Sequence, residues 1–208
     1  MSKFMSYDPW SNIKTRNGIP GDEIISMLQK SIRRGLEHNA LCAAYEMYIT
    51  SPHFEDKMWR RLLSISVEDI GFGDVYAPEL IYTLNNMRKE FLYQDGDRPM
   101  FFIHAIRYLC RQKKERSSDN VKNMVIKDFA HGRTVEVPDY AYDVHTVKGR
   151  AMGRDEMQFL TEASRVIPQL EGEDIKKIYN EYLEYCKNEE KDTGKPEVQP
   201  FEYNTWQF

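Results

Sequence analysis

The sequence predicts an all-α protein built as a multi-helix bundle or array of antiparallel neighbours. Nearly every periodic segment repeats its apolar residues at the spacing of an amphipathic helix. No convincing pair of segments alternates apolar and polar residues as half-buried strands would. Most of the periodic segments are joined by short connections, which favour antiparallel packing of consecutive helices.

The first two helices are predicted over residues 22–34 and 37–50. Gly35 is placed to end the first helix, and Pro52 follows the second. The apolar face of the first helix consists of Ile24, Ile25, Leu28 and Ile32. The residues that the second helix is expected to bury are Leu41, Ala44, Tyr45 and Tyr48.

Three further helices are predicted over residues 55–69, over residues 76–93 and after Pro99, which suits the first turn of a helix. Their apolar faces are expected to pack together into the core. The residues that we expect to be nearly fully buried there are Trp59, Leu62, Leu84, Ile103 and Ile106.

A sixth helix is predicted after Ser117, whose hydroxyl can cap its first turn. Two or three more helices are expected after it, the last over residues 172–188. The apolar positions of the sixth helix are Val121, Met124, Val125 and Phe129.

The chain is expected to form one helical domain over residues 21–188. Residues 1–20 are polar and contain turn signals, so they are predicted to be an N-terminal arm. Residues 189–208 are predicted to be a tail whose aromatic side chains dock on the domain or on a neighbouring subunit. These aromatic residues are Phe201, Tyr203, Trp206 and Phe208.

Composition narrows the classes of protein to consider. The formal net charge of -4 gives no global reason to expect nucleic acid or anionic lipid as a partner. No stretch reaches the roughly 18 apolar residues that a membrane span needs, and no secretion signal is recognisable. The cysteines Cys42, Cys110 and Cys186 form no CxxC pair, so we expect buried, reduced thiols in a cytoplasmic protein.

Three segments carry a resemblance to a known family. Residues 25–35 read Ile-Ser-Met-Leu-Gln-Lys-Ser-Ile-Arg-Arg-Gly, and Asn39-Ala40-Leu41 is followed by Tyr45-Glu46-Met47. The third segment has Arg60, Arg61, Glu68, Asp69, Gly71 and Asp74 as its motif residues. Together they resemble the helical C-terminal region of the replication-associated recombination protein A (maintenance of genome stability) family of AAA+ ATPases. The resemblance covers about residues 20–130.

This resemblance implies a fold like the oligomerisation collar of clamp loaders and a setting in DNA replication, recombination and repair. It implies self-association as a dimer or tetramer. It also suggests a full-length AAA+ relative or a single-stranded-DNA-binding protein as a partner. The sequence has no GxxxxGK[ST] loop, and the segment from Gly149 to Gly153 is too short to replace it. We therefore expect no ATP hydrolysis, no cofactor and no enzymatic activity.

Two groups of residues allow a metal or acid–base interpretation. Glu68, Asp69 and Asp74 could bind a divalent cation, but helix capping or an internal ion pair is favoured for them. Asp143 and His145 could serve a metal-dependent enzyme, which is one alternative function. No HExxH or HxH pattern supports it. Thr146, Lys148, Arg150 and Arg154 follow, and the whole run is better interpreted as a polar network or a phosphate-contacting surface.

Basic residues suggest a DNA-binding surface. On the helix after Pro99 the stripe consists of His104, Arg107, Arg111 and Lys114, spaced along one helical face. A shorter stripe on the first helix consists of Lys30, Arg33 and Arg34. The longer stripe has no interleaved Glu to neutralise it. The leading hypothesis is a non-enzymatic, self-associating module whose basic faces contact DNA. The alternatives are a solvated basic face, and an adaptor that docks on a full-length AAA+ relative.

Overall fold

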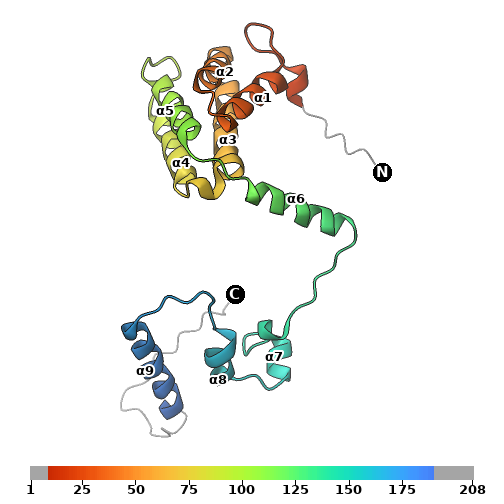
Figure 1. The fold of residues 1–208 in the computed structure, drawn as a ribbon, viewed down its shortest axis with the longest axis vertical. Coiled ribbons are helices and arrows are strands. Elements are labelled where there is room, and N and C mark those ends of the chain that lie inside the picture. The colour runs from red at the N-terminus through yellow and green to blue at the C-terminus, as the bar shows by residue number, and fades with distance from the viewer. Residues whose placement is uncertain (1–8, 190–208) are drawn as a thin grey trace. The chain divides into compact units, whose positions relative to one another are not determined.

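A computed structural model describes residues 9–189 (Figure 1). The regular secondary structure of these residues is helical, so the predicted all-α class is confirmed. An isolated antiparallel bridge joins Lys14 to Pro20. The chain divides into two compact units, with the boundary between Arg133 and Thr134. The range 21–188, predicted as one helical domain, spans this boundary.

The first unit is a bundle in which α5 contacts each of the four helices that precede it. The bounds predicted from the sequence lie within four residues of those observed, except that the fourth helix ends at Met87 and not at residue 93. The five helices are α1 (Gly21–Arg33), α2 (Glu37–Thr50), α3 (Pro52–Ile65), α4 (Ala77–Met87) and α5 (Arg98–Arg111). Large side chains that are completely buried between them include Leu28, Ile32, Met47, Met58, Leu62, Phe102 and Ile106.

Most of the predicted core is confirmed. Trp59, Leu62, Leu84 and Ile106 are buried, as expected from their register. Ile103 is only half-buried, because it lies at the edge of the core between α2 and α5. The prediction was wrong for Tyr45, which is 50% exposed on the outer side of α2.

A single glutamate in the core holds two arginines. Glu55 is completely buried, and its carboxylate accepts hydrogen bonds from Arg98 Nε at 3.0 Å and Nη2 at 2.9 Å. Arg88 Nη1 lies 3.1 Å from the same carboxylate. Arg88 also binds Asp56, so two cations face two anions. Buried charges are tolerated when they are paired in this way, and these pairs join α3 to α5 and to η4 (Arg88–Glu90).

Residues 9–20 pack against the bundle, although the sequence predicted an arm. They begin with η1 (Pro9–Asn12), whose Trp10 is 8% exposed. The Trp10 ring stacks on His53 and meets Phe54 edge-on, with both centroid distances at 5.0 Å. A large aromatic side chain buried in this way fixes the segment to the first turn of α3.

The connection between α3 and α4 lies at the end of the bundle from which α6 (Ser117–Ala130) leaves (Figure 1). After α3 the chain forms a π-helical turn, η2 (Ser66–Ile70), and a 3-10 turn, η3 (Gly71–Gly73). The predicted cap of α6 was wrong: Arg116 occupies the N-cap position without a side-chain cap bond, and Ser117 is the first helical residue.

The second unit is described from Thr134 to Glu189. It contains η5 (Asp139–Ala141), α7 (Val147–Ala151), α8 (Glu156–Gln158), η6 (Phe159–Ala163) and α9 (Glu173–Glu189). Leu160 is buried, and Tyr179 of α9 donates a hydrogen bond to its carbonyl at 3.0 Å. The predicted last helix is confirmed. The aromatic residues Phe201, Tyr203, Trp206 and Phe208 lie outside the described residues.

The three cysteines differ in exposure. Cys110 is buried, and burial raises the pKa of its thiol to about 11. Cys186 is half-buried, whereas Cys42 is exposed. The expectation of a buried thiol was wrong for Cys42, because it lies on the face of α2 that points away from the core. Over residues 9–189, no helix is both long and apolar enough to cross a membrane.

Candidate interaction surfaces

A charged junction connects α1, η2 and the start of α6. We define the charged junction as Gln29, Arg33, Glu68, Asp69 and Arg116. Asp69 has a fully buried side chain, and its carboxylate lies 2.7 Å from Arg33 Nε and 3.0 Å from Arg116 Nη1. Gln29 Nε2 donates to the second oxygen of Asp69 at 3.1 Å. Glu68 lies 3.2 Å from Arg33 Nη2. Of the two structural roles predicted for these carboxylates, capping or an internal ion pair, Glu68 and Asp69 have the ion pair, which satisfies the buried charge.

Two glycines allow the chain to pass close to the segment between α5 and α6. Gly71 has a φ of +51°, and a Cβ there would lie 2.7 Å from the carbonyl oxygen of Glu115. A Cβ on Gly73 would overlap the carbonyl of Lys113. The backbone N–H of Glu115 donates to Asp69 O at 3.0 Å, and the Glu115 carboxylate accepts from Phe72 N at 3.2 Å. The start of α6 is therefore fixed to η2 by side chains and backbone.

The remaining motif residues also have structural contacts. Asp74 accepts from Tyr76 N at 3.0 Å and from the Tyr108 hydroxyl. Burial and the hydrogen bond to Asp74 raise the pKa of Tyr108 to about 12. Asp74 is not the N-cap of α4, a position that Tyr76 occupies. Arg61 Nη1 donates to Gln29 Oε1 at 3.3 Å, whereas Arg60 is exposed.

The basic stripe predicted on the fifth helix is interrupted. Arg107 Nε lies 2.9 Å and Arg111 Nε 3.4 Å from the Glu37 carboxylate, so one anion from α2 serves two cations. The prediction was wrong at Lys114, because α5 ends at Arg111. The Lys114 ammonium donates to the carbonyls of Leu109 and Cys110, at 2.9 and 3.1 Å, and so caps that helix. Burial lowers the pKa of Lys114.

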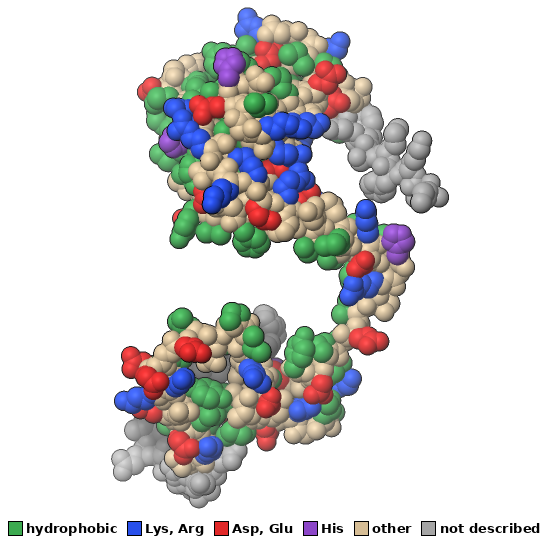
Figure 2. All heavy atoms as spheres, viewed as in Figure 1, with side chains coloured by type: hydrophobic (Ala, Val, Ile, Leu, Met, Phe, Trp, Pro, Cys, Tyr) green, Lys and Arg blue, Asp and Glu red, His purple; other side chains and the backbone are tan. Residues whose placement is uncertain are grey.

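The basic residues of α1 are divided between two roles. Arg33 belongs to the charged junction, whereas Lys30 and Arg34 are exposed. A Cβ on Gly35 would lie 3.3 Å from the carbonyl of Cys110, so the ends of α1 and α5 adjoin. Lys30 and Arg34 therefore lie at the same end of the bundle as Arg111. Figure 2 shows Lys and Arg side chains gathered over one face of this unit.

In the second unit, residues 143–149 form a loop and the start of α7. Asp143 accepts from His145 N at 3.0 Å and lies 3.1 Å from His145 Nδ1, which lowers the pKa of Asp143. Thr146 caps α7 by accepting from Gly149 N at 3.0 Å. A Cβ on Gly149 would overlap the backbone of Asp143. This glycine is needed for close packing of the loop.

The three cations that follow Thr146 each contact another residue of the second unit. Lys148 lies over the Tyr142 ring at 4.0 Å. Arg150 Nη1 donates to Val144 O at 2.9 Å, and Arg154 pairs with Asp139 at 2.9 Å.

Within residues 9–189, no three His, Cys, Asp or Glu side chains gather as metal ligands. Asp143 and His145 supply two ligands, fewer than the three protein ligands of a catalytic zinc site.

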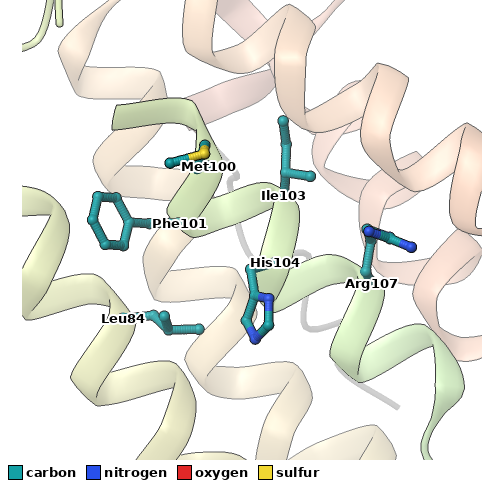
Figure 3. A pocket seen from close by; sticks show the side chains of 6 residues that line it. All are labelled: Leu84, Met100, Phe101, Ile103, His104 and Arg107. Carbon is teal, nitrogen blue, oxygen red and sulfur yellow. The ribbon is translucent and has the colours of Figure 1, made fainter. Parts of the chain in front are cut away.

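Two shallow apolar grooves flank α5. The α4–α5 groove has a volume of about 460 Å³ and combines one residue of α4 with five residues of α5 (Figure 3). Its lining residues are Leu84, Met100, Phe101, Ile103, His104 and Arg107. The α2–α5 groove, of about 420 Å³, shares Ile103 with it. The other residues of the α2–α5 groove are His38, Leu41, Cys42, Tyr45, Glu46 and Phe102.

Helix α6 presents a large apolar face outside the bundle. Its residues from Asn120 to Ala130 are all exposed. Five large apolar side chains there are between 49% and 59% exposed, and contiguous apolar surface of this kind marks interaction sites. We define the α6 face as Val121, Met124, Val125, Ile126 and Phe129.

Sequence reasoning missed the two grooves and the role of Glu37. The only sign of the grooves in the sequence was that Met100 and Tyr45 are apolar residues at the edges of their helical faces. Glu37 is 70 residues from Arg107, so local charge patterns could not indicate their pairing.

The chain matches no protein-family model, and it matches no curated protein sequence.

Proposed function

We propose that this chain is a non-enzymatic, self-associating helical module that acts in DNA replication or recombination. The observation that carries self-association is the α6 face, whose five apolar side chains are about half exposed. The setting in replication or recombination is supported by the resemblance of residues 25–35 and 60–77 to the AAA+ family. A bundle with an outward helix would suit a collar-like oligomerisation region.

Energetics support an interface on α6. Fully burying a Val, Ile, Met or Phe side chain contributes about 1.5–3 kcal/mol, so the exposed half of each is worth roughly 1 kcal/mol. Several such contributions offset the loss of translational and rotational freedom on association only when they act together. The clustering of five such residues on one helix is therefore more informative than any single exposed residue.

Light scattering over a wide range of protein concentrations tests self-association. The wild type should show the mass of a dimer or tetramer. Val121→Ser/Val125→Ser should shift it to the monomer mass with unchanged helical circular dichroism. Asn123→Ser/Lys127→Ser, on the opposite side of α6, is the matched control and should keep the wild-type mass. A monomeric wild type at every concentration would contradict the proposal.

A second candidate is an adaptor that docks on a full-length AAA+ relative or on a single-stranded-DNA-binding protein. The α4–α5 groove favours it, because partner helices commonly dock in apolar grooves with a few polar groups at the edge. Pull-down of the purified relative by wild type but not by Met100→Glu would support the adaptor.

A further inference from the structure

We infer that the α6 face of one copy docks into the α4–α5 groove of a second copy of this chain. The inference rests on the proposed self-association and names the two surfaces that make the contact. Val121, Met124, Val125 and Phe129 follow the i, i+3, i+4, i+8 spacing of a helix that binds in a groove. With 14 residues, α6 is about 21 Å long, enough to lie along several turns of α5.

Helix α6 is held away from the groove of its own copy. Only residues 112–116 separate α5 from α6, and Arg116 is fixed to Asp69 at 3.0 Å. The Glu115 backbone is bound to Asp69 as well. Folding α6 back along α5 would break both contacts and expose the buried Asp69 charge. Figure 1 shows α6 leaving the bundle at the η2 end. The groove and the helix that fits it can therefore meet only between copies.

Apolar burial, not charge, drives this contact. The polar edge of the α4–α5 groove carries His104 and Arg107. Arg107 already has Glu37 as its partner at 2.9 Å. On α6, Asp128 precedes Phe129 and is paired with Arg133 at 2.5 Å. The contact therefore places Phe129 in the groove, with these ion pairs at its edge. Two such contacts related by a two-fold axis close a dimer.

The test uses two variants that each disable one surface, Val125→Glu on α6 and Met100→Glu in the groove. Both positions are about half exposed, so the monomer should keep its fold, which circular dichroism checks. Each variant alone should dimerise about tenfold more weakly or worse, because a charge enters an apolar contact. An equimolar mixture should regain dimers, because the α6 of Met100→Glu can dock in the intact groove of Val125→Glu. Tyr82→Glu, at an exposed apolar position of α4 that does not line the groove, is the matched control and should dimerise as the wild type does.

The outcomes separate this inference from the proposed function. Dimers of Met100→Glu with wild-type affinity would overturn the groove contact while self-association stands. A mixture of the two variants that stays monomeric would also overturn it. A monomeric wild type would overturn both.

Discussion

At the scale of single residues, Asp69 best explains what the segment from Arg60 to Asp74 does in this chain. Its buried carboxylate receives Arg33 from α1 and Arg116 from the start of α6, with Gln29 as a neutral third partner. Removing one member of a buried ion pair costs more than the pair contributes, because the partner charge remains. The motif residue Asp69 thus fixes where α6 begins, and any function of α6 depends on it.

Asp69→Asn keeps the shape of the side chain but removes its charge. We expect the free energy of unfolding to fall by about 3 kcal/mol, since Arg33 and Arg116 lose the buried anion that they share and keep only the more exposed Glu68. Urea unfolding followed by circular dichroism measures this change. The matched control is Asp128→Asn, which removes a carboxylate that is 48% exposed and paired with Arg133 at the surface. It should cost less than about 1 kcal/mol. Equal losses in the two variants would show that Asp69 is not a structural anchor.

At the scale of helices, sequence periodicity predicted much of the fold but not which faces find a partner. The bounds of α1 and α2 follow from apolar spacing and from Gly35 and Pro52. The α6 face has the same spacing as a core helix, yet its side chains are exposed. Periodicity shows which side of a helix is apolar, whereas the partner of that side depends on the tertiary structure.

The candidate site was less predictable than the helices for a similar reason. For Glu68 and Asp69 the sequence left capping or an internal ion pair open, and their partners could not be predicted, because Arg33 and Arg116 lie 36 and 47 residues from Asp69. Glu37 likewise reaches the α5 arginines from another helix. Contacts at such separations in sequence are set by packing. The π-helical turn at residues 66–70 was also missed, since nothing in the local sequence distinguishes it from the end of α3.

The register of α3 can be tested with two leucines. Leu62→Ala should lower the free energy of unfolding by about 2–5 kcal/mol, because Leu62 is completely buried and its removal leaves a cavity. Leu92→Ala makes the same chemical change at a site that is 78% exposed, and it should change stability by less than about 0.5 kcal/mol. Denaturant unfolding of both variants measures the difference. A negligible effect at Leu62 would show that the register of α3 is wrong.

At the scale of the whole molecule, charge decides how strongly DNA could bind. The chain carries a formal net charge of -4, so binding must depend on local groups of cations. The exposed Lys30, Arg34 and Arg111 lie at one end of the bundle, and Arg107 lies one turn from Arg111 along α5. The carboxylate of Glu37 between Arg107 and Arg111 reduces their combined charge to one.

This pairing changes the salt dependence expected for DNA binding. Each phosphate contact made by a free cation contributes about -0.9 to the slope of log K against log salt on duplex DNA. Arg107→Ala/Arg111→Ala should therefore flatten the slope by about 0.9, not by twice that amount, because Glu37 already neutralises one arginine. Glu37→Gln should steepen the slope by a similar amount, since it releases that cation.

Titrations with labelled forked DNA at several low salt concentrations, where screening is least, measure both changes. Lys176→Ala/Lys177→Ala, which removes two exposed cations from α9, is the control and should leave the slope unchanged. If the wild type binds no single-stranded, duplex or forked DNA even at low salt, the basic residues form only a solvated face, and the adaptor becomes the leading hypothesis.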